Sequence, residues 1–244
     1  MSTAKDGAQK VSKKGPPAII KFYLVLYNIF STLGWSYILM FTVVHIFNLD
    51  GKSYEIPPDG TLTQNHLPLP IPFYTNYTRV GYATALVQSF ALLEVVHVLL
   101  GWVRSPLVTT VMQVSSRLFL VWGVVERFDE THTNPLFTTM VFAWSLTEVI
   151  RYSFYALGLL GSEPKSLLYF RYTTFYVLYP LGAGSEAFLN FSTLPKEISV
   201  WNAYDWFRAM LFLIWWPGLY IMYTHMIKQR RKVFGGGRKG SKKD

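Results

Sequence analysis

Residues 167–194 read LLYFRYTTFYVLYPLGAGSEAFLNFSTL, a predominantly apolar stretch that holds a phenol and a carboxylate seven positions apart. An apolar run of about 20 residues is long enough to cross a bilayer as a helix. A carboxylate inside such a run costs about 2.5–3.5 kcal/mol on insertion scales, so a glutamate there indicates a function. The stretch therefore predicts a membrane span, Leu167–Leu189, in which Tyr179 and Glu186 are candidates for acid–base chemistry on a lipid.

The rest of the chain repeats this apolar pattern. Of its 244 residues, 51% are hydrophobic and 17% are aromatic, which is too apolar for an ordinary soluble domain. One longer Pro-rich loop, Asn48–Arg79, and otherwise short polar or charged breaks separate six apolar runs, and we therefore predict an all-α fold, a polytopic membrane protein with six transmembrane helices. The predicted spans are Ile19–Phe47, Val80–Val103, Leu107–Val125, Leu136–Leu160, Leu167–Leu189 and Tyr204–Ile227.

The net charge of +9 is concentrated at the two ends of the chain. Five lysines lie within the first 21 residues, and eight basic residues follow Ile227. Six spans place both termini on one side of the membrane, and basic flanks mark that side as cytosolic. The predicted organisation is a basic cytosolic tail (1–18), a six-helix membrane domain (19–227) and a second basic cytosolic tail (228–244). Such tails favour membrane lipids, and not nucleic acid, as partners.

Composition also excludes several kinds of chemistry. The chain contains no cysteine, which excludes disulfides, zinc–thiolate sites and a thiol nucleophile. Its five histidines are scattered and do not form the clustered boxes of a di-iron oxygenase or desaturase, so no metal is expected. His45 and Asp50 have the His-x4-Asp spacing of glycerolipid acyltransferases, but the glycine-rich phosphate-binding block that should follow is absent.

Charged side chains also lie inside three other predicted spans. The second span contains Glu94 and His97, the third contains Arg117, and the fourth contains Glu148 and Arg151. Spacings of three and four residues put neighbours on one face of a helix, so the four charged groups could neutralise one another as a buried network. Such a network either holds the bundle together or supports a site. The histidine alone is more typical of a hydrogen-bonded structural residue.

The seven-residue spacing of Tyr179 and Glu186 is compatible with two local structures, a regular helix and a broken one. Seven residues are nearly two helical turns, so Tyr179 and Glu186 would lie about 20° apart on one face and roughly 10 Å apart along the axis. A regular helix would leave a gap between them for a substrate. Pro180, Gly182 and Gly184 could instead break the helix and bring the groups closer. The alternative without chemistry is a kinked span whose tyrosine packs in an interface while the glutamate reaches the surface.

These residues resemble a known family. Tyr179-Pro180-x-Gly182-x-x-Ser185-Glu186 is similar to the signature of the very-long-chain (3R)-3-hydroxyacyl-CoA dehydratases, the protein tyrosine phosphatase-like membrane proteins of the endoplasmic reticulum. The resemblance covers about Phe22–Lys232. The other blocks that match in order are Tyr27-Asn28 with Gly34-Trp35, Leu93-Glu94-x-x-His97, Gln113-x-x-Ser116-Arg117, Trp144-Ser145-x-Thr147-Glu148-x-Ile150-Arg151-Tyr152-Ser153, Arg171-Tyr172 and His225-Met226-x-x-Gln229-Arg230-Arg231.

The resemblance implies a hydro-lyase of the fatty-acid elongation cycle. In the third step of that cycle a 3-hydroxyacyl-CoA loses water to give a trans-2-enoyl-CoA, with no cofactor. The family's catalytic pair falls on Tyr179 and Glu186, and which of the two removes the C2 proton stays open. The two arginines, 117 and 151, are candidates for the thioester or the CoA phosphates, or are partners of the glutamates. The supporting candidates are Arg117, Arg151, Ser185, Glu94, His97 and Glu148.

The resemblance also implies a place in the cell and a set of partners. We expect a multi-pass protein of the endoplasmic reticulum membrane, with an acyl-CoA as substrate and an elongase, a ketoacyl reductase and an enoyl reductase as partners. Two glycosylation acceptor triplets, at Asn76 and Asn190, fall on the predicted far side. The remaining alternative is a non-catalytic scaffold of the elongation complex or a transporter. A transporter would more readily show inverted repeats, and the sequence shows none.

Overall fold

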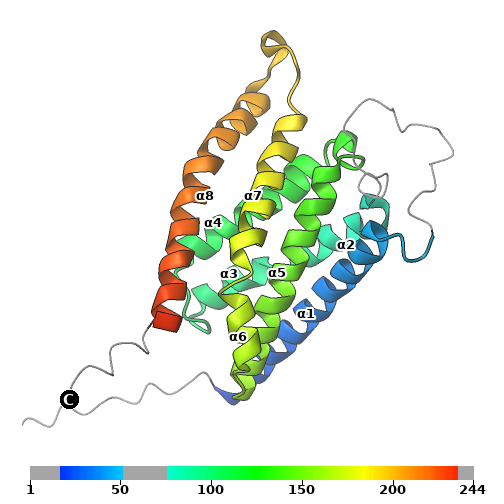
Figure 1. The fold of residues 1–244 in the computed structure, drawn as a ribbon. Coiled ribbons are helices and arrows are strands. Elements are labelled where there is room, and N and C mark those ends of the chain that lie inside the picture. The colour runs from blue at the N-terminus through cyan, green and yellow to red at the C-terminus, as the bar shows by residue number, and fades with distance from the viewer. Residues whose placement is uncertain (1–16, 52–75, 236–244) are drawn as a thin grey trace, which may run out of the picture.

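The computed structural model describes residues 17–51 and 76–235, and in these two stretches the chain is helical with no strand, which confirms the all-α fold class (Figure 1). Most of the two predicted basic tails and most of the loop after the first helix lie outside these residues. The elements are α1 (Ala18–Ile46), α2 (Tyr77–Ser89), α3 (Leu92–Leu99), α4 (Leu107–Leu118), the π-helical η2 (Phe119–Val125), the short η3 (Asp129–Thr131), α5 (Pro135–Leu160), α6 (Lys165–Arg171), α7 (Phe175–Ser192), the short η4 (Ile198–Val200) and α8 (Ala203–Gly235).

Within the described residues, four helical stretches are long and apolar enough to cross a membrane. They coincide with the first, second, third and sixth predicted spans. The fourth and fifth predicted spans correspond to α5 and α7, which carry the charged Glu148, Arg151 and Glu186 inside otherwise apolar sequence. The four stretches are Ala18–Ile46, Tyr77–Leu99, Leu107–Val125 and Ala203–Gly235.

The central helix, α5, has clear start and stop signals in the sequence. At its start the side-chain oxygen of Asn134 accepts a hydrogen bond from the backbone N–H of Leu136 at 3.0 Å, and Pro135 occupies the first helical position. At its end Gly161 adopts the left-handed conformation (φ 86°) that suits glycine. These signals fix a 26-residue helix that packs along both α1 and α7.

The fifth predicted span is two helices and not one, so the single helix expected over Leu167–Leu189 is wrong at its beginning. The chain leaves the helix at residues 172–174 and re-enters it as α7. Here the hydroxyl of Thr174 donates to the backbone carbonyl of Phe170 at 2.9 Å, and such side-chain bonds compete with a regular helix. The break lets α6 and α7 take different directions at this end of the bundle (Figure 1).

The proline of the Tyr179–Glu186 signature does not break α7, which is continuous over Phe175–Ser192. Because Pro180 has no N–H, the carbonyl of Tyr176 four residues earlier loses its helical donor. The hydroxyl of Tyr223 on α8 donates to that carbonyl at 3.3 Å. The neighbouring helix thus supplies the missing hydrogen bond, and of the two readings of the spacing the structure has the regular helix.

The helices form one bundle with its core between α1 and α5. The largest cluster of buried side chains includes Trp35 and Ile38 from α1 and Phe137, Met140 and Trp144 from α5. Beyond α5, the bundle continues with α7 and then α8 (Figure 1). The start of α1 and the end of α8 lie at the same end of the bundle (Figure 1).

At the other end, a buried arginine fastens α7 to α8. Arg208 has no exposed surface and donates to the side chain of Asp205 at 2.5 Å and to the hydroxyl of Thr193 at 2.5 Å. Its guanidinium also lies 4.3 Å from the centre of the Phe128 ring. A buried cation with a carboxylate, a hydroxyl and a ring around it fixes the position of the two helices there.

The two predicted glycosylation acceptors are inaccessible in this fold. Asn76 is 0% exposed and its amide nitrogen donates to Thr42, while Asn190 is 3% exposed and donates to the backbone carbonyl of Arg208. A glycan requires a free, exposed amide nitrogen. The side chains of both acceptor asparagines therefore make structural hydrogen bonds, and glycosylation at these positions stays a prediction.

Candidate active site

The candidate site lies along one face of α7. Because the helix is regular, Tyr179 and Glu186 lie nearly two turns apart, about 20° from each other around the axis. They are also close enough to interact electrostatically. Among the described residues, the hydroxyl of Tyr179 has no recorded hydrogen-bond partner. This arrangement leaves a phenol that can donate a hydrogen bond and a carboxylate that can accept a proton on the same face.

Trp144 of α5 holds the carboxylate. Its indole N–H donates to Oε1 of Glu186 at 2.5 Å, and the indole itself is almost fully buried. A second indole, that of Trp215 on α8, is also close enough to interact with this carboxylate. The carboxylate is therefore placed by neutral donors, and it forms no ion pair with any described residue.

A glycine and a serine of the signature bring α7 close to α5. A Cβ added at Gly182 would lie 3.4 Å from Cβ of Ala143 and 3.8 Å from the Trp144 ring, which are ordinary contact distances, so α7 packs closely on α5 at this position. One turn on, Ser185 is buried and its hydroxyl shares a 2.7 Å hydrogen bond with the hydroxyl of Thr139. Ser185 thus has a positioning contact between α7 and α5.

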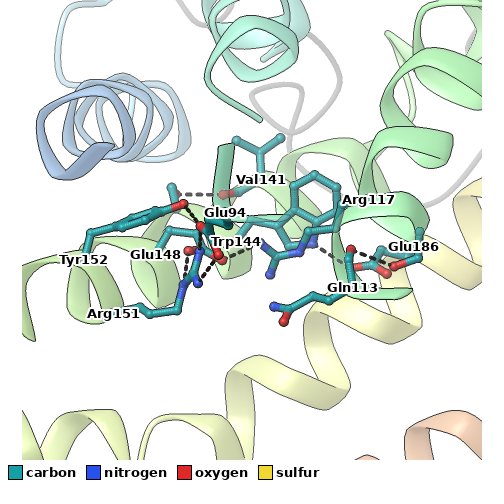
Figure 2. A network of polar contacts seen from close by, with 11 residues as sticks. Glu94, Gln113, Arg117, Val141, Trp144, Glu148, Arg151, Tyr152 and Glu186 are labelled. Atoms are coloured by element: carbon teal, nitrogen blue, oxygen red, sulfur yellow. Dashed lines mark hydrogen bonds and ion pairs between the residues drawn. The ribbon is translucent and has the colours of Figure 1, made fainter. Parts of the chain in front are cut away.

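The four charged residues of the second, third and fourth predicted spans form the network that their spacing predicts. Arg151 donates to both carboxylate oxygens of Glu94 at 2.6 and 2.8 Å and, through Nε, to Glu148 at 2.6 Å. Arg117 donates to the other oxygen of Glu148, and the Tyr152 hydroxyl donates to Glu94. The network joins α3, α4 and α5 (Figure 2).

Trp144 connects this network to the α7 carboxylate. The guanidinium of Arg117 lies 4.8 Å from the centre of the Trp144 ring, and the same ring donates to Glu186 (Figure 2). Arg117 also acts electrostatically on Tyr179 and Glu186. Of the two expected roles for the arginines, the structure has pairing with the glutamates.

A small polar cavity opens beside the network. It holds about 10 Å³, which is room for about one water molecule. A cavity of this size fits a bridging water and not an acyl chain. Its lining residues are Gln88, Ala91, Glu94, Gln113, Val114, Arg117, Glu148, Arg151 and Tyr152.

His97 belongs to a different cluster, as a structural histidine would. It is buried, shares a 3.0 Å hydrogen bond with the Tyr23 hydroxyl, and stacks on Trp102 with ring centres 5.9 Å apart. The ring contacts of its side chain are with Tyr23 and Tyr27 of α1 and with Trp102, which follows α3. The structure therefore does not bring His97 together with Glu186.

Sequence reasoning assigned no role to Trp144, which is the direct neighbour of Glu186. One signal was available, because Trp144 lies four residues before Glu148 and so on the same face of α5. The pairing of Trp144 with a residue 42 positions later required the packing of α5 against α7. The contact of Thr139 with Ser185 could not be predicted for the same reason, because it also depends on the packing of α5 against α7.

Comparison with known proteins gives a consistent result. The model of the family described as "Protein tyrosine phosphatase-like protein, PTPLA" matches residues 88–236. A probable very-long-chain (3R)-3-hydroxyacyl-CoA dehydratase of Schizosaccharomyces pombe is 40% identical over 86% of this chain and 92% of its own length. A very-long-chain (3R)-3-hydroxyacyl-CoA dehydratase of Caenorhabditis elegans is 37% identical over 90% of this chain and 98% of its own. Mouse very-long-chain (3R)-3-hydroxyacyl-CoA dehydratase 2 is 35% identical over 91% and 84%. No solved structure matches the chain.

Replacing the central carboxylate of the network should destabilise the bundle. Glu148 is 1% exposed and is shared by Arg117 and Arg151, so Glu148→Gln leaves two partly buried cations short of a partner. Breaking a buried pair in this way costs about 3–5 kcal/mol. We expect a clearly lower melting temperature of the detergent-purified protein. Glu163→Gln, an exposed change in the turn after α5, is the control, and equal melting of Glu148→Gln and wild type would contradict the prediction.

Proposed function

The chain belongs to the protein tyrosine phosphatase-like family, and from that membership we propose that it is a hydro-lyase that dehydrates very-long-chain (3R)-3-hydroxyacyl-CoA in fatty-acid elongation. The observation that carries the proposal is the pairing of Tyr179 and Glu186 on one face of a regular α7, in a chain whose relatives are named as this dehydratase. The product would be the trans-2-enoyl-CoA, and the leaving group would be water.

We assign the removal of the C2 proton to Glu186. Its carboxylate takes the proton, the C2–H electron pair becomes the C2=C3 double bond, and the C3–O bond breaks. The Glu186 carboxylate suits this role because the indole N–H of Trp144 orients it and it forms no ion pair with any described residue. An ion pair would stabilise the charged carboxylate and make it a weaker base. The nearby cation, Arg117, is already paired with Glu148.

We assign the protonation of the leaving hydroxyl to Tyr179. Its phenol donates a proton to the C3 oxygen as that bond breaks, so the oxygen leaves as water and not as hydroxide. The proton taken by Glu186 then returns to the phenolate through solvent or product water, which restores both groups. The absence of a recorded partner for this hydroxyl among the described residues supports the assignment.

The proposed place of the protein is the endoplasmic reticulum membrane, with six spans and both termini in the cytosol. Two features support this topology: the start of α1 and the end of α8 share one end of the bundle, and the basic residues of the chain are concentrated at its two ends. The substrate is then an acyl-CoA, and the other enzymes of the elongation cycle would be its neighbours in that membrane.

The catalytic assignment is tested on purified protein with a long-chain (3R)-3-hydroxyacyl-CoA. We expect wild type to form the enoyl-CoA, and Tyr179→Phe and Glu186→Gln each to lower kcat by about a hundredfold or more, because each removes one proton-transfer group. Tyr220→Phe and Glu197→Gln are the matched controls, since both side chains are exposed and away from the site. Inactive wild type, or full activity in both site variants, would point to a scaffold or transporter.

The positioning role of the indole is tested by Trp144→Phe. The change keeps an aromatic ring beside Arg117 but removes the N–H donated to Glu186. We expect kcat to fall about tenfold with little change in KM, as for the loss of one hydrogen bond to a charged group. Trp122→Phe, which removes an indole hydrogen bond to Ser89 on the outer surface, is the control. An effect on KM alone would contradict this role.

The topology can be tested without removing any native thiol, because the chain has no cysteine. We expect an impermeant maleimide to label Ser166→Cys, in the first turn of α6, in intact reticulum vesicles. Thr133→Cys, before α5, should be labelled only after the vesicles are permeabilised, since the ends of α5 face opposite sides. Both positions are exposed in the fold. Labelling of Thr133→Cys in intact vesicles would contradict the six-span arrangement.

A further inference from the structure

Aromatic side chains gather at the end of the bundle where α8 ends. They come from the last turns of α5, from α6, from the beginning of α7 and from the last turn of α8. The Phe234 ring centre lies 6.2 Å from the ring centres of both Tyr169 and Tyr172, so the cluster connects α6 with α8. We call this cluster the aromatic rim; it comprises Phe154, Tyr155, Tyr169, Tyr172, Tyr176 and Phe234.

Two arginines lie against the aromatic rim. The guanidinium of Arg171 lies 4.6 Å from the ring centres of Phe154 and Tyr155, and it donates to the Tyr155 hydroxyl at 3.0 Å. The guanidinium of Arg230 lies 5.5 Å from the Tyr176 ring centre and 5.4 Å from that of Phe234. Both arginines are partly buried.

Neither rim arginine has a recorded carboxylate partner among the described residues. Nη1 of Arg171 and Nε of Arg230 are covered from solvent and have no hydrogen-bond partner. The inner arginines differ in having counter-ions: Arg117, Arg151 and Arg208 each pair with a glutamate or aspartate, although Nε of Arg208 also has no hydrogen-bond partner. A partly desolvated cation with no counter-ion is costly, and a bound anion would offset that cost. Guanidinium groups bind phosphate with particular strength.

The position of the two cations fits the length of the proposed substrate. Tyr176, beside Arg230, precedes Glu186 by ten residues on the continuous α7, a distance of about 15 Å. In an acyl-CoA the extended pantetheine arm bridges such a distance between the thioester and the nucleotide phosphates. CoA also carries two separate phosphate groups, the diphosphate and the 3′-phosphate, which matches two separate guanidinium groups.

We propose that Arg171 and Arg230 bind the phosphates of CoA, with the aromatic rim packing against the adenine and the upper pantetheine arm. The proposal rests on the proposed dehydratase function and gives its substrate a route to Glu186 from the end of the bundle where α8 ends. Aromatic rings alone are common where helices leave a membrane, so the unpaired cations carry the inference. A lipid headgroup offers the same phosphate chemistry, and the experiment separates the two.

The test compares two thioesters of the same 3-hydroxyacyl chain, one of CoA and one of pantetheine, which lacks the phosphates. Wild type, Arg171→Gln and Arg230→Gln are assayed in nanodiscs of neutral phosphatidylcholine and, in a second series, in nanodiscs that also contain anionic lipid. We expect each variant to lose about tenfold or more in kcat/KM on the CoA thioester, mainly through KM, because each loses charge-assisted bonds to phosphate. On the pantetheine thioester the variants should equal wild type. Arg231→Gln, at an exposed neighbouring position, should change either value by less than about threefold.

Three results would overturn the proposal. Equal losses on both thioesters would mean that the arginines only support the fold, and no loss on the CoA thioester would mean that they do not contact it. Losses that occur only when the nanodiscs contain anionic lipid would assign the cations to headgroups. If wild type turns over neither thioester, the dehydratase function itself fails. Equilibrium binding of CoA alone then decides, since weaker binding by both variants supports the phosphate site and equal binding overturns it.

Discussion

The bundle depends on one carboxylate that is almost sealed from solvent. Glu148 of α5 accepts from Arg117 of α4 and from Arg151 of its own helix, and Arg151 continues to Glu94 of α3. Between helices in a membrane, lipid tails remove most of the hydrophobic driving force, so polar contacts and close packing must supply the specificity. A charge-balanced network across three helices meets that need. It also fixes the face of α5 against which α7 packs.

The same network determines what the α7 carboxylate can do. Because Arg117 is paired with Glu148, it remains over the Trp144 ring without forming an ion pair with Glu186. The indole N–H of Trp144, which is a neutral donor, then orients the carboxylate of Glu186. A carboxylate that is oriented but not paired keeps the capacity to accept a proton from a substrate. The stability of the bundle and the proposed chemistry thus share Arg117 and Trp144.

Sequence patterns predicted those features that depend on spacing within one helix. The alignment of Tyr179 with Glu186 and the pairing of Glu148 with Arg151 on one face of α5 both follow from 3.6 residues per turn. Contacts between distant segments were not predictable in this way. The Tyr223 hydroxyl compensates Pro180 from 43 residues away, and the Trp144 indole reaches Glu186 through the packing of α5 against α7. The burial of Asn76 and Asn190 was also not predictable, because a three-residue acceptor triplet carries no information on burial.

The two ends of α7 differ, and the difference indicates from which end a substrate would enter the proposed site. At one end, Arg208 is fully buried, forms an ion pair with Asp205 and donates to Thr193, so the cation that joins α7 to α8 there has a counter-ion. At the other end the same two helices meet through aromatic rings, and the cations there, Arg171 and Arg230, have no recorded carboxylate. Separating paired, desolvated charges costs several kcal/mol, whereas rings can part around a ligand that replaces their contacts. An anionic substrate would therefore enter at the aromatic rim and extend along α7 past Tyr179 to Glu186. On this account a carboxylate nearer the far end of its helix is still within reach of a thioester that arrives from the cytosol.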